Sequence, residues 1–155
     1  MRLDRTWIGA HIPHQGSMCL LAEVLSWDAQ QLLGRAESHR DASHPLRAHG
    51  RLGSVCAIEY AAQAVAVHGA LLQPSSQPLN AGTHSGMLAS ARSVELAVAR
   101  LDDISGDLLI SVQRLHGNAY SALYDFAVSE RLDAQTGAAP PLLAQGRLSL
   151  WLRAA

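Results

Sequence analysis

Residues 53–73 read GSVCAIEYAAQAVAVHGALLQ, and this stretch decides the fold of the chain. It is dense in alanine, and its apolar residues recur at helical spacing, notably Val55, Ile58, Ala62, Val65 and Leu72. Ser54 can cap the start, and Pro74 follows the end, where a helix cannot easily continue. Apolar residues occupy nearly every face and Glu59 is the only formally charged side chain, so the helix must be surrounded on most sides. We therefore expect one buried helix over residues 54–72.

The segments on either side of this helix predict strands. Residues 18–28 and 31–40 look extended and are so close together that we expect a hairpin. After a loop-like stretch, 74–85, further strands are expected at 87–98, 108–113, 120–128 and 148–152, with a turn at Gly117 and Asn118. Six antiparallel strands curled around the helix would cover it, because each strand offers it one apolar face. The expected fold is α+β, as a single domain over residues 1–155.

The composition argues against two classes of partner. Charged residues make up 16% of the chain and the formal net charge is -1, so no basic field favours nucleic acid or an anionic membrane. The amino end has no apolar run typical of a signal peptide, and no stretch is long enough to span a bilayer. Cys19 and Cys56 form no CxxC pair, which favours free thiols. We expect a soluble cytoplasmic protein.

Glu59 and Gln63 are the central candidates for chemistry, because residues four apart lie on the same face of a helix. Desolvation raises the pKa of a buried carboxyl group, which can hold it protonated as a general acid near neutral pH. The structural alternative is that Glu59 caps a backbone group or pairs with an arginine such as Arg47 or Arg51 across a dimer interface. Gln63 is expected to be a hydrogen-bonding partner rather than a catalyst.

Three histidines precede the helix at intervals of five residues, namely His39, His44 and His49. The chain has no HExxH motif, no cysteine pair and no familiar metal-ligand spacing, so we expect no metal. One of the three acting as a general base beside Glu59 is the sharper hypothesis. Ordinary structural or surface roles are expected for the five others, His11, His14, His68, His84 and His116.

Three stretches resemble the hotdog-fold 3-hydroxyacyl-[acyl-carrier-protein] dehydratases. IPHQGSMCLLAEVLSWD resembles the Pro-His and short apolar strand with which these enzymes begin. IEYAAQAVAVHGALL resembles their central helix, in which a catalytic acidic residue is followed four residues later by Gln in many members. LDDISGDLL resembles their later Pro-Gly-Asp turn. The chain is most similar to the ApeP-like branch, encoded with aryl polyene pigment genes.

This resemblance implies a hotdog domain that dehydrates a 3-hydroxyacyl chain on an acyl carrier protein to a trans-2-enoyl thioester, without a cofactor. Glu59 would protonate the leaving hydroxyl, and a histidine just ahead of the helix would act as base across a dimer interface. His44 falls one residue out of register with that histidine in HPLRAHGRLGS, and His49 competes with it. Backbone N–H groups near Gly53 and Ser54 would polarise the thioester carbonyl, and Gln63 would line the substrate site.

The resemblance also implies assembly as a homodimer or as a heterodimer with another hotdog dehydratase. Two other functions stay open: a hotdog thioesterase, in which the helix carboxylate acts as a base on water, and a catalytically weak subunit that stabilises a partner dehydratase.

Overall fold

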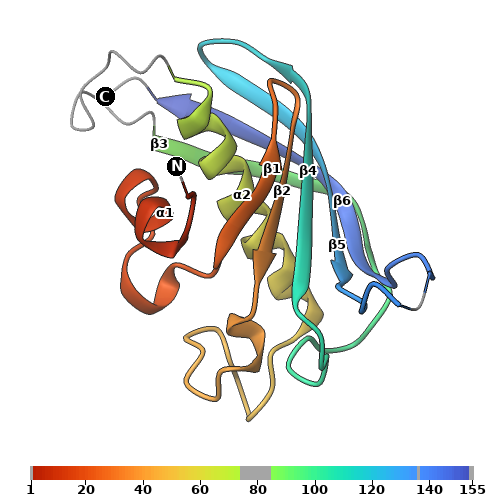
Figure 1. Ribbon diagram of the computed structural model, residues 1–155. Coiled ribbons are helices and arrows are strands. Elements are labelled where there is room, and N and C mark those ends of the chain that lie inside the picture. The colour runs from red at the N-terminus through yellow and green to blue at the C-terminus, as the bar shows by residue number, and fades with distance from the viewer. Residues whose placement is uncertain (1, 74–84, 136, 154–155) are drawn as a thin grey trace.

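The computed structural model describes residues 2–73, 85–135 and 137–153. One antiparallel sheet contains β1 (Glu23–Trp27), β2 (Gln31–Ala36), β3 (Ser85–Leu96), β4 (Leu108–Gly117), β5 (Ser121–Glu130) and β6 (Leu142–Arg153). The order across the sheet is β1-β2-β4-β5-β6-β3, so β1 and β3 are its edges. The sheet curls around the long helix α2 (Ala57–Leu71), as Figure 1 shows. The expected hotdog fold is confirmed.

Helix α2 is covered as its sequence requires. A 3-10 turn, η3 (Ser54–Cys56), leads into it, and together the two elements span residues 54–71. No side chain from 57 to 71 is fully exposed, and the helix contacts β2, β3, β4 and β5. Ser54 does not cap the helix, because neither η3 nor α2 has a side-chain hydrogen bond at its start. Packing against the sheet, rather than a cap, therefore holds the helix in place.

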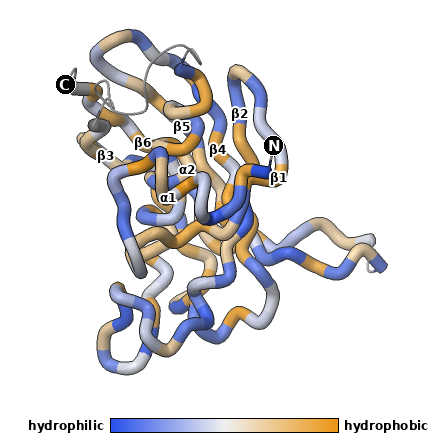
Figure 2. Tube along the Cα trace, turned by 60° about the vertical axis from the view of Figure 1, so that its left-hand side comes forward, coloured by the Kyte–Doolittle hydropathy of each residue, from blue (hydrophilic) through white to orange (hydrophobic). Residues whose placement is uncertain are grey.

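The strands bury alternate residues against α2. On β4 and β5 the buried set is Leu108, Ile110, Val112, Ala122, Tyr124, Phe126 and Val128. This is the period-two pattern of a sheet with one covered face, and Figure 2 shows hydrophobic and hydrophilic residues interspersed along the trace. Tyr120 does not continue the pattern, because it lies in the turn before β5 and is 74% exposed. Asn118 forms that turn by accepting the N–H groups of Tyr120 and Ser121.

The turn ahead of β4 anchors the segment that precedes α2. A Cβ atom at Gly106 would lie 2.7 Å from the carbonyl oxygen of Arg131, so the close approach requires glycine. His39 is fully buried, and its Nε2 lies 3.1 Å from the carbonyl oxygen of Ile104 and 3.0 Å from that of Gly106. Arg40 is paired with Asp107 at 2.7 Å. The turn thus holds the segment that precedes α2.

The structure differs from the sequence expectation mainly at the amino end. A short helix, α1 (Arg5–His11), was not expected, and Asp4 caps it by accepting the N–H of Trp7. The first strand begins at Glu23 rather than at residue 18, since residues 16–18 form the 3-10 turn η1 (Gly16–Met18). The expected loop at 74–85 falls largely outside the described residues. Among the helices that are described, none has the length and apolar character needed to cross a membrane.

Candidate active site

Glu59 lies in the first turn of α2, and its side chain is 33% exposed. Two side chains approach its Oε1 atom: Nε2 of His14 at 3.1 Å and Nε2 of Gln63 at 3.2 Å. Both contacts are made by the same oxygen, and Oε2 has no hydrogen-bond partner within the described part of the chain. The carboxylate is therefore held at one oxygen and open at the other.

Gln63 connects this carboxylate to the chain that covers it. The side chain is fully buried and uses both ends of its amide. Its Oε1 accepts the N–H of Leu20 at 2.9 Å, and its Nε2 donates to the carbonyl oxygen of Met18 at 2.7 Å as well as to Glu59. Both amide hydrogens and the carbonyl are thus paired with protein groups, which fixes the orientation of Gln63 and so of Glu59.

The pKa of Glu59 is lower than usual, which corrects the expectation of a raised value. The hydrogen bond from His14 is the largest cause, and the bond from Gln63 and the charge of His14 act in the same direction. Partial burial raises the pKa but does not outweigh them. The apolar sequence of the helix suggested that Glu59 would be protonated at neutral pH. The hydrogen bonds from His14 and Gln63 instead favour its ionised form. An ionised carboxylate can accept a proton.

His14 reaches Glu59 from the segment that follows α1. Ile8 and Ile12 are buried in the core, so α1 is anchored beside α2, and Pro13 leads directly to His14. The Nδ1 atom of His14 is buried without a hydrogen-bond partner among the described groups, although 26% of the side chain is exposed. The exposed part therefore lies away from Nδ1. His14 was expected to have an ordinary role, because nothing in its local sequence indicates a contact 45 residues away.

His44 belongs to a different set of contacts. Its Nδ1 accepts the N–H of Leu46 at 3.0 Å, so the neutral ring carries its proton on Nε2, which lies 3.1 Å from the hydroxyl of Tyr60. Tyr60 in turn lies 2.7 Å from the hydroxyl of Ser38, which donates to the carbonyl oxygen of Leu20. His44 is 5% exposed, and burial is the main reason that its pKa is lowered. Neither of these ring contacts involves Glu59.

Within the described residues, no hydrogen bond or ion pair joins the other predicted site residues to Glu59. His49 is exposed in the turn between Ala48 and Arg51, with a positive φ of 53°. The N–H of Ser54 already donates to the carbonyl oxygen of Ala99 at 3.1 Å, and the carbonyl of Gly53 accepts the N–H of Cys56. No group of three potential metal ligands gathers anywhere in the described ranges.

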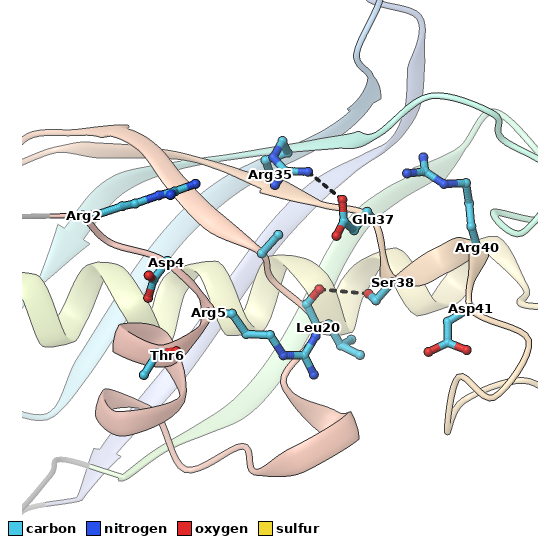
Figure 3. Close-up of a pocket in the computed structure, with 11 residues that line it drawn as sticks. Arg2, Asp4, Arg5, Thr6, Leu20, Arg35, Glu37, Ser38, Arg40 and Asp41 are labelled. Atoms are coloured by element: carbon cyan, nitrogen blue, oxygen red, sulfur yellow. Dashed lines mark hydrogen bonds and ion pairs between the residues drawn. The ribbon is translucent and has the colours of Figure 1, made fainter.

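A separate surface pocket of about 670 Å³ lies beside α1 and β2 (Figure 3). Charged residues line much of it, including Arg2, Arg5, Arg35 and Glu37, and Ser38 and Leu20 also border it. Arg35 is paired with Glu37 at 3.0 Å, so part of this charge is neutralised within the pocket. Neither Glu59 nor His14 is part of its lining. We therefore place the candidate active site at the carboxylate on α2 rather than in this pocket.

A sequence model of the ApeP-like family, described as the ApeP dehydratase, matches residues 7–151. This chain belongs to the ApeP-like family. The matched region includes α2 with Glu59 and Gln63 and also the Pro-His segment with His14. The family is one of dehydratases, which are hydro-lyases. A comparison with curated protein sequences finds no match.

Solved structures share the fold of this ApeP-like chain. The dehydratase heterocomplex ApeI:P from Xenorhabdus doucetiae aligns with a TM-score of 0.73 and 22% identity, covering 94% of this chain and 90% of that one. A thioesterase family protein from Silicibacter pomeroyi aligns with a TM-score of 0.59 and 8% identity, over 86% and 85% of the two chains. Thioesterase HI1161 from Haemophilus influenzae aligns with a TM-score of 0.56 and 10% identity, covering 85% of this chain and 78% of that one. At these identities the likeness shows the hotdog fold alone.

Proposed function

We propose that this protein is a 3-hydroxyacyl-[acyl-carrier-protein] dehydratase that forms trans-2-enoyl thioesters in aryl polyene biosynthesis. The observation that carries the proposal is Glu59, whose Oε1 is fixed by His14 and Gln63 and whose Oε2 is open. Membership in a dehydratase family supports the reaction class. The substrate is then an acyl chain on a phosphopantetheine arm that lies along α2.

Dehydration needs a group that removes a proton from C2 and a second group that protonates the hydroxyl leaving C3. Glu59 suits the first task, because its carboxylate is ionised at neutral pH and can accept the C2 proton through the unpaired Oε2. This reverses the role that the sequence suggested, in which Glu59 was the acid. Gln63 serves to orient the carboxylate and does not bind substrate, since its amide is fully paired within the chain.

We propose a supporting role for His44. A neutral imidazole has one basic nitrogen, and in His44 that nitrogen accepts the N–H of Leu46. If His44 acted as a base through this nitrogen, the hydrogen bond would break and the N–H of Leu46 would be left without an acceptor. Through Tyr60 and Ser38, His44 instead helps to hold the carbonyl oxygen of Leu20, and the N–H of the same residue donates to Gln63.

We further propose that the protein works as a hotdog dimer joined through the free edge of β3. This strand is twelve residues long and carries exposed apolar side chains, Met87, Leu88 and Leu96. Unpaired edges of this kind favour strand addition. The Xenorhabdus doucetiae structure is a dehydratase heterocomplex, ApeI:P, which supports a second hotdog dehydratase as the partner.

The test is an assay of the purified full-length chain, alone and mixed with a hotdog dehydratase encoded beside it. The probes are the N-acetylcysteamine thioesters of 3-hydroxyoctanoate and octanoate. The proposal expects enoyl thioester from the hydroxyacyl probe and no free thiol from the saturated probe. Thiol release from the saturated probe without dehydration of the other would show a thioesterase. Activity only in the mixture, unaffected by changes at Glu59, would show a supporting subunit.

A further inference from the structure

Proton transfer at Glu59 needs a second group, and the described part of this chain places one ionisable side chain in direct contact with the carboxylate. Nε2 of His14 lies 3.1 Å from Oε1 of Glu59, which is hydrogen-bonding distance. The two residues come from separate parts of the chain, the segment after α1 and the first turn of α2. The tertiary fold therefore brings His14 and Glu59 into contact.

The contact is held from several sides. Gln63 fixes the carboxylate and also binds the backbone on either side of Cys19, through Met18 and Leu20. The segment that carries His14 is therefore attached to α2 at three points: the His14 contact itself and the two backbone bonds of Gln63. Such support from neighbouring groups is typical of sites that must keep a reactive geometry.

Part of the His14 side chain is accessible from outside. Its Nδ1 is enclosed, whereas 26% of the side chain is exposed, so the accessible part lies away from Nδ1. Glu59 is 33% exposed and leaves Oε2 without a protein partner among the described groups. Both side chains can therefore be approached by the same ligand.

We propose that His14 is the second catalytic residue of this site, donating the proton that the leaving hydroxyl takes up while Glu59 of the same chain accepts the C2 proton. The inference rests on the proposed dehydratase function. It assigns the whole proton transfer to one protomer, rather than to a carboxylate in one chain and a histidine in the other.

The reaction balances with these two groups alone. The C2–H bond breaks and its proton moves to the carboxylate of Glu59, a double bond forms between C2 and C3, and the C3–O bond breaks. The departing oxygen takes a proton from Nε2 of protonated His14 and leaves as water. Glu59 then holds one proton and His14 lacks one, and transfer across the 3.1 Å contact restores both groups.

Other ionisable groups near the pair are few. The charge interaction that acts on Glu59 comes from His14. Cys56, in the preceding turn, has a pKa raised by burial and by Glu59, so its thiol stays neutral near pH 7. His11, on α1, lies 2.7 Å from the carbonyl oxygen of Trp7 and stacks on that ring. Within the described part of the chain, His14 is therefore the ionisable side chain best placed to exchange a proton with Glu59.

The experiment compares His14→Gln with the wild type on the 3-hydroxyoctanoyl N-acetylcysteamine probe, using the full-length chain with its copurifying partner where there is one. Glutamine keeps an N–H donor for Glu59 but cannot deliver a proton. We expect kcat to fall about 100-fold to 10,000-fold. His116→Gln is the matched control, since His116 is exposed at the far end of β4.

A double-mutant cycle with Glu59→Gln separates catalysis from structural support. Groups that act as a unit give a double variant hardly worse than either single variant, whereas independent effects multiply. Thermal unfolding verifies the fold, and His14→Asn provides a second variant if His14→Gln does not fold. An unchanged kcat in a folded His14 variant would overturn the inference. So would losses that multiply in the double variant. Full activity in Glu59→Gln would instead overturn the proposed function.

Discussion

Gln63→Leu is the substitution that tests most sharply how the site is held together. Leucine has a similar volume but cannot form the three hydrogen bonds of the amide. The N–H of Leu20, which is buried, loses its acceptor at 2.9 Å, and the carbonyl oxygen of Met18 loses a donor at 2.7 Å. Glu59 also loses one of its two donors.

The expected loss of stability follows from these groups. An unsatisfied buried polar group costs about 1–3 kcal/mol. Leu20 N–H should cost close to the full amount, while the carbonyl oxygen of Met18 is only partly buried and regains some hydration. We therefore expect the free energy of unfolding to fall by about 2–4 kcal/mol.

Urea unfolding measures this difference directly, since the midpoint shifts while the slope stays unchanged if only stability is altered. Gln113→Leu is the matched control, because Gln113 is exposed on β4. It should change the free energy of unfolding by less than about 0.5 kcal/mol. A loss below about 1 kcal/mol in Gln63→Leu would refute the claim that this amide joins the amino-terminal segment to α2.

Three further outcomes are expected. Burial lowers the pKa of His39, His44 and His68 in the folded protein. The neutral rings therefore stabilise the folded state fully above the pKa of an unfolded histidine, about 6.5. This stabilisation is lost as the pH falls through the lower pKa values of the folded state. Thermal unfolding measured from about pH 6.5 downward should show that the free energy of unfolding decreases as the pH is lowered, by at most about 1.4 kcal/mol per pH unit for each histidine. A free energy of unfolding that does not change with pH would contradict this prediction. Tyr60→Phe should cost about 1–3 kcal/mol in urea unfolding yet leave the acyl-thioester kinetics nearly unchanged, whereas a large drop in kcat would reinstate His44 as a catalytic group. Sedimentation should show a dimer at micromolar concentration, for the chain alone or with its partner, and a stable monomer in both cases would rule out assembly through β3.

Much of the fold could be predicted from sequence because its signals are local and repeated. Apolar residues around all faces of residues 54–72 required a wrapped helix, and alternation along β4 and β5 fixed which residues face it. Helix α1 was missed because it has only seven residues and buries only Ile8, so it lacks a periodic apolar stripe. Its cap at Asp4 was the one available signal.

The site was predictable only in part, for a physical reason. The spacing of Glu59 and Gln63 correctly placed both on one face of α2, and the 3.2 Å bond between them agrees with it. The sign of the pKa shift depends on donors, however, and the strongest donor is His14, which reaches Glu59 through tertiary folding. The hypothesis that His39, His44 or His49 acts beside Glu59 rested on their position just ahead of the helix. In this chain His39 and His44 are buried and hydrogen-bonded to other groups.

Glu59→Gln provides the most direct test of the central claim that Glu59 transfers the proton in a dehydration. The carbonyl oxygen of the introduced amide can still accept from His14 and Gln63, so the fold should be kept, but an amide cannot accept the C2 proton. The measurement is kcat/KM for the 3-hydroxyoctanoyl thioester, together with the thermal unfolding temperature. The account predicts a loss of about 100-fold to 10,000-fold at an almost unchanged unfolding temperature. Wild-type turnover by a folded Glu59→Gln protein would contradict it.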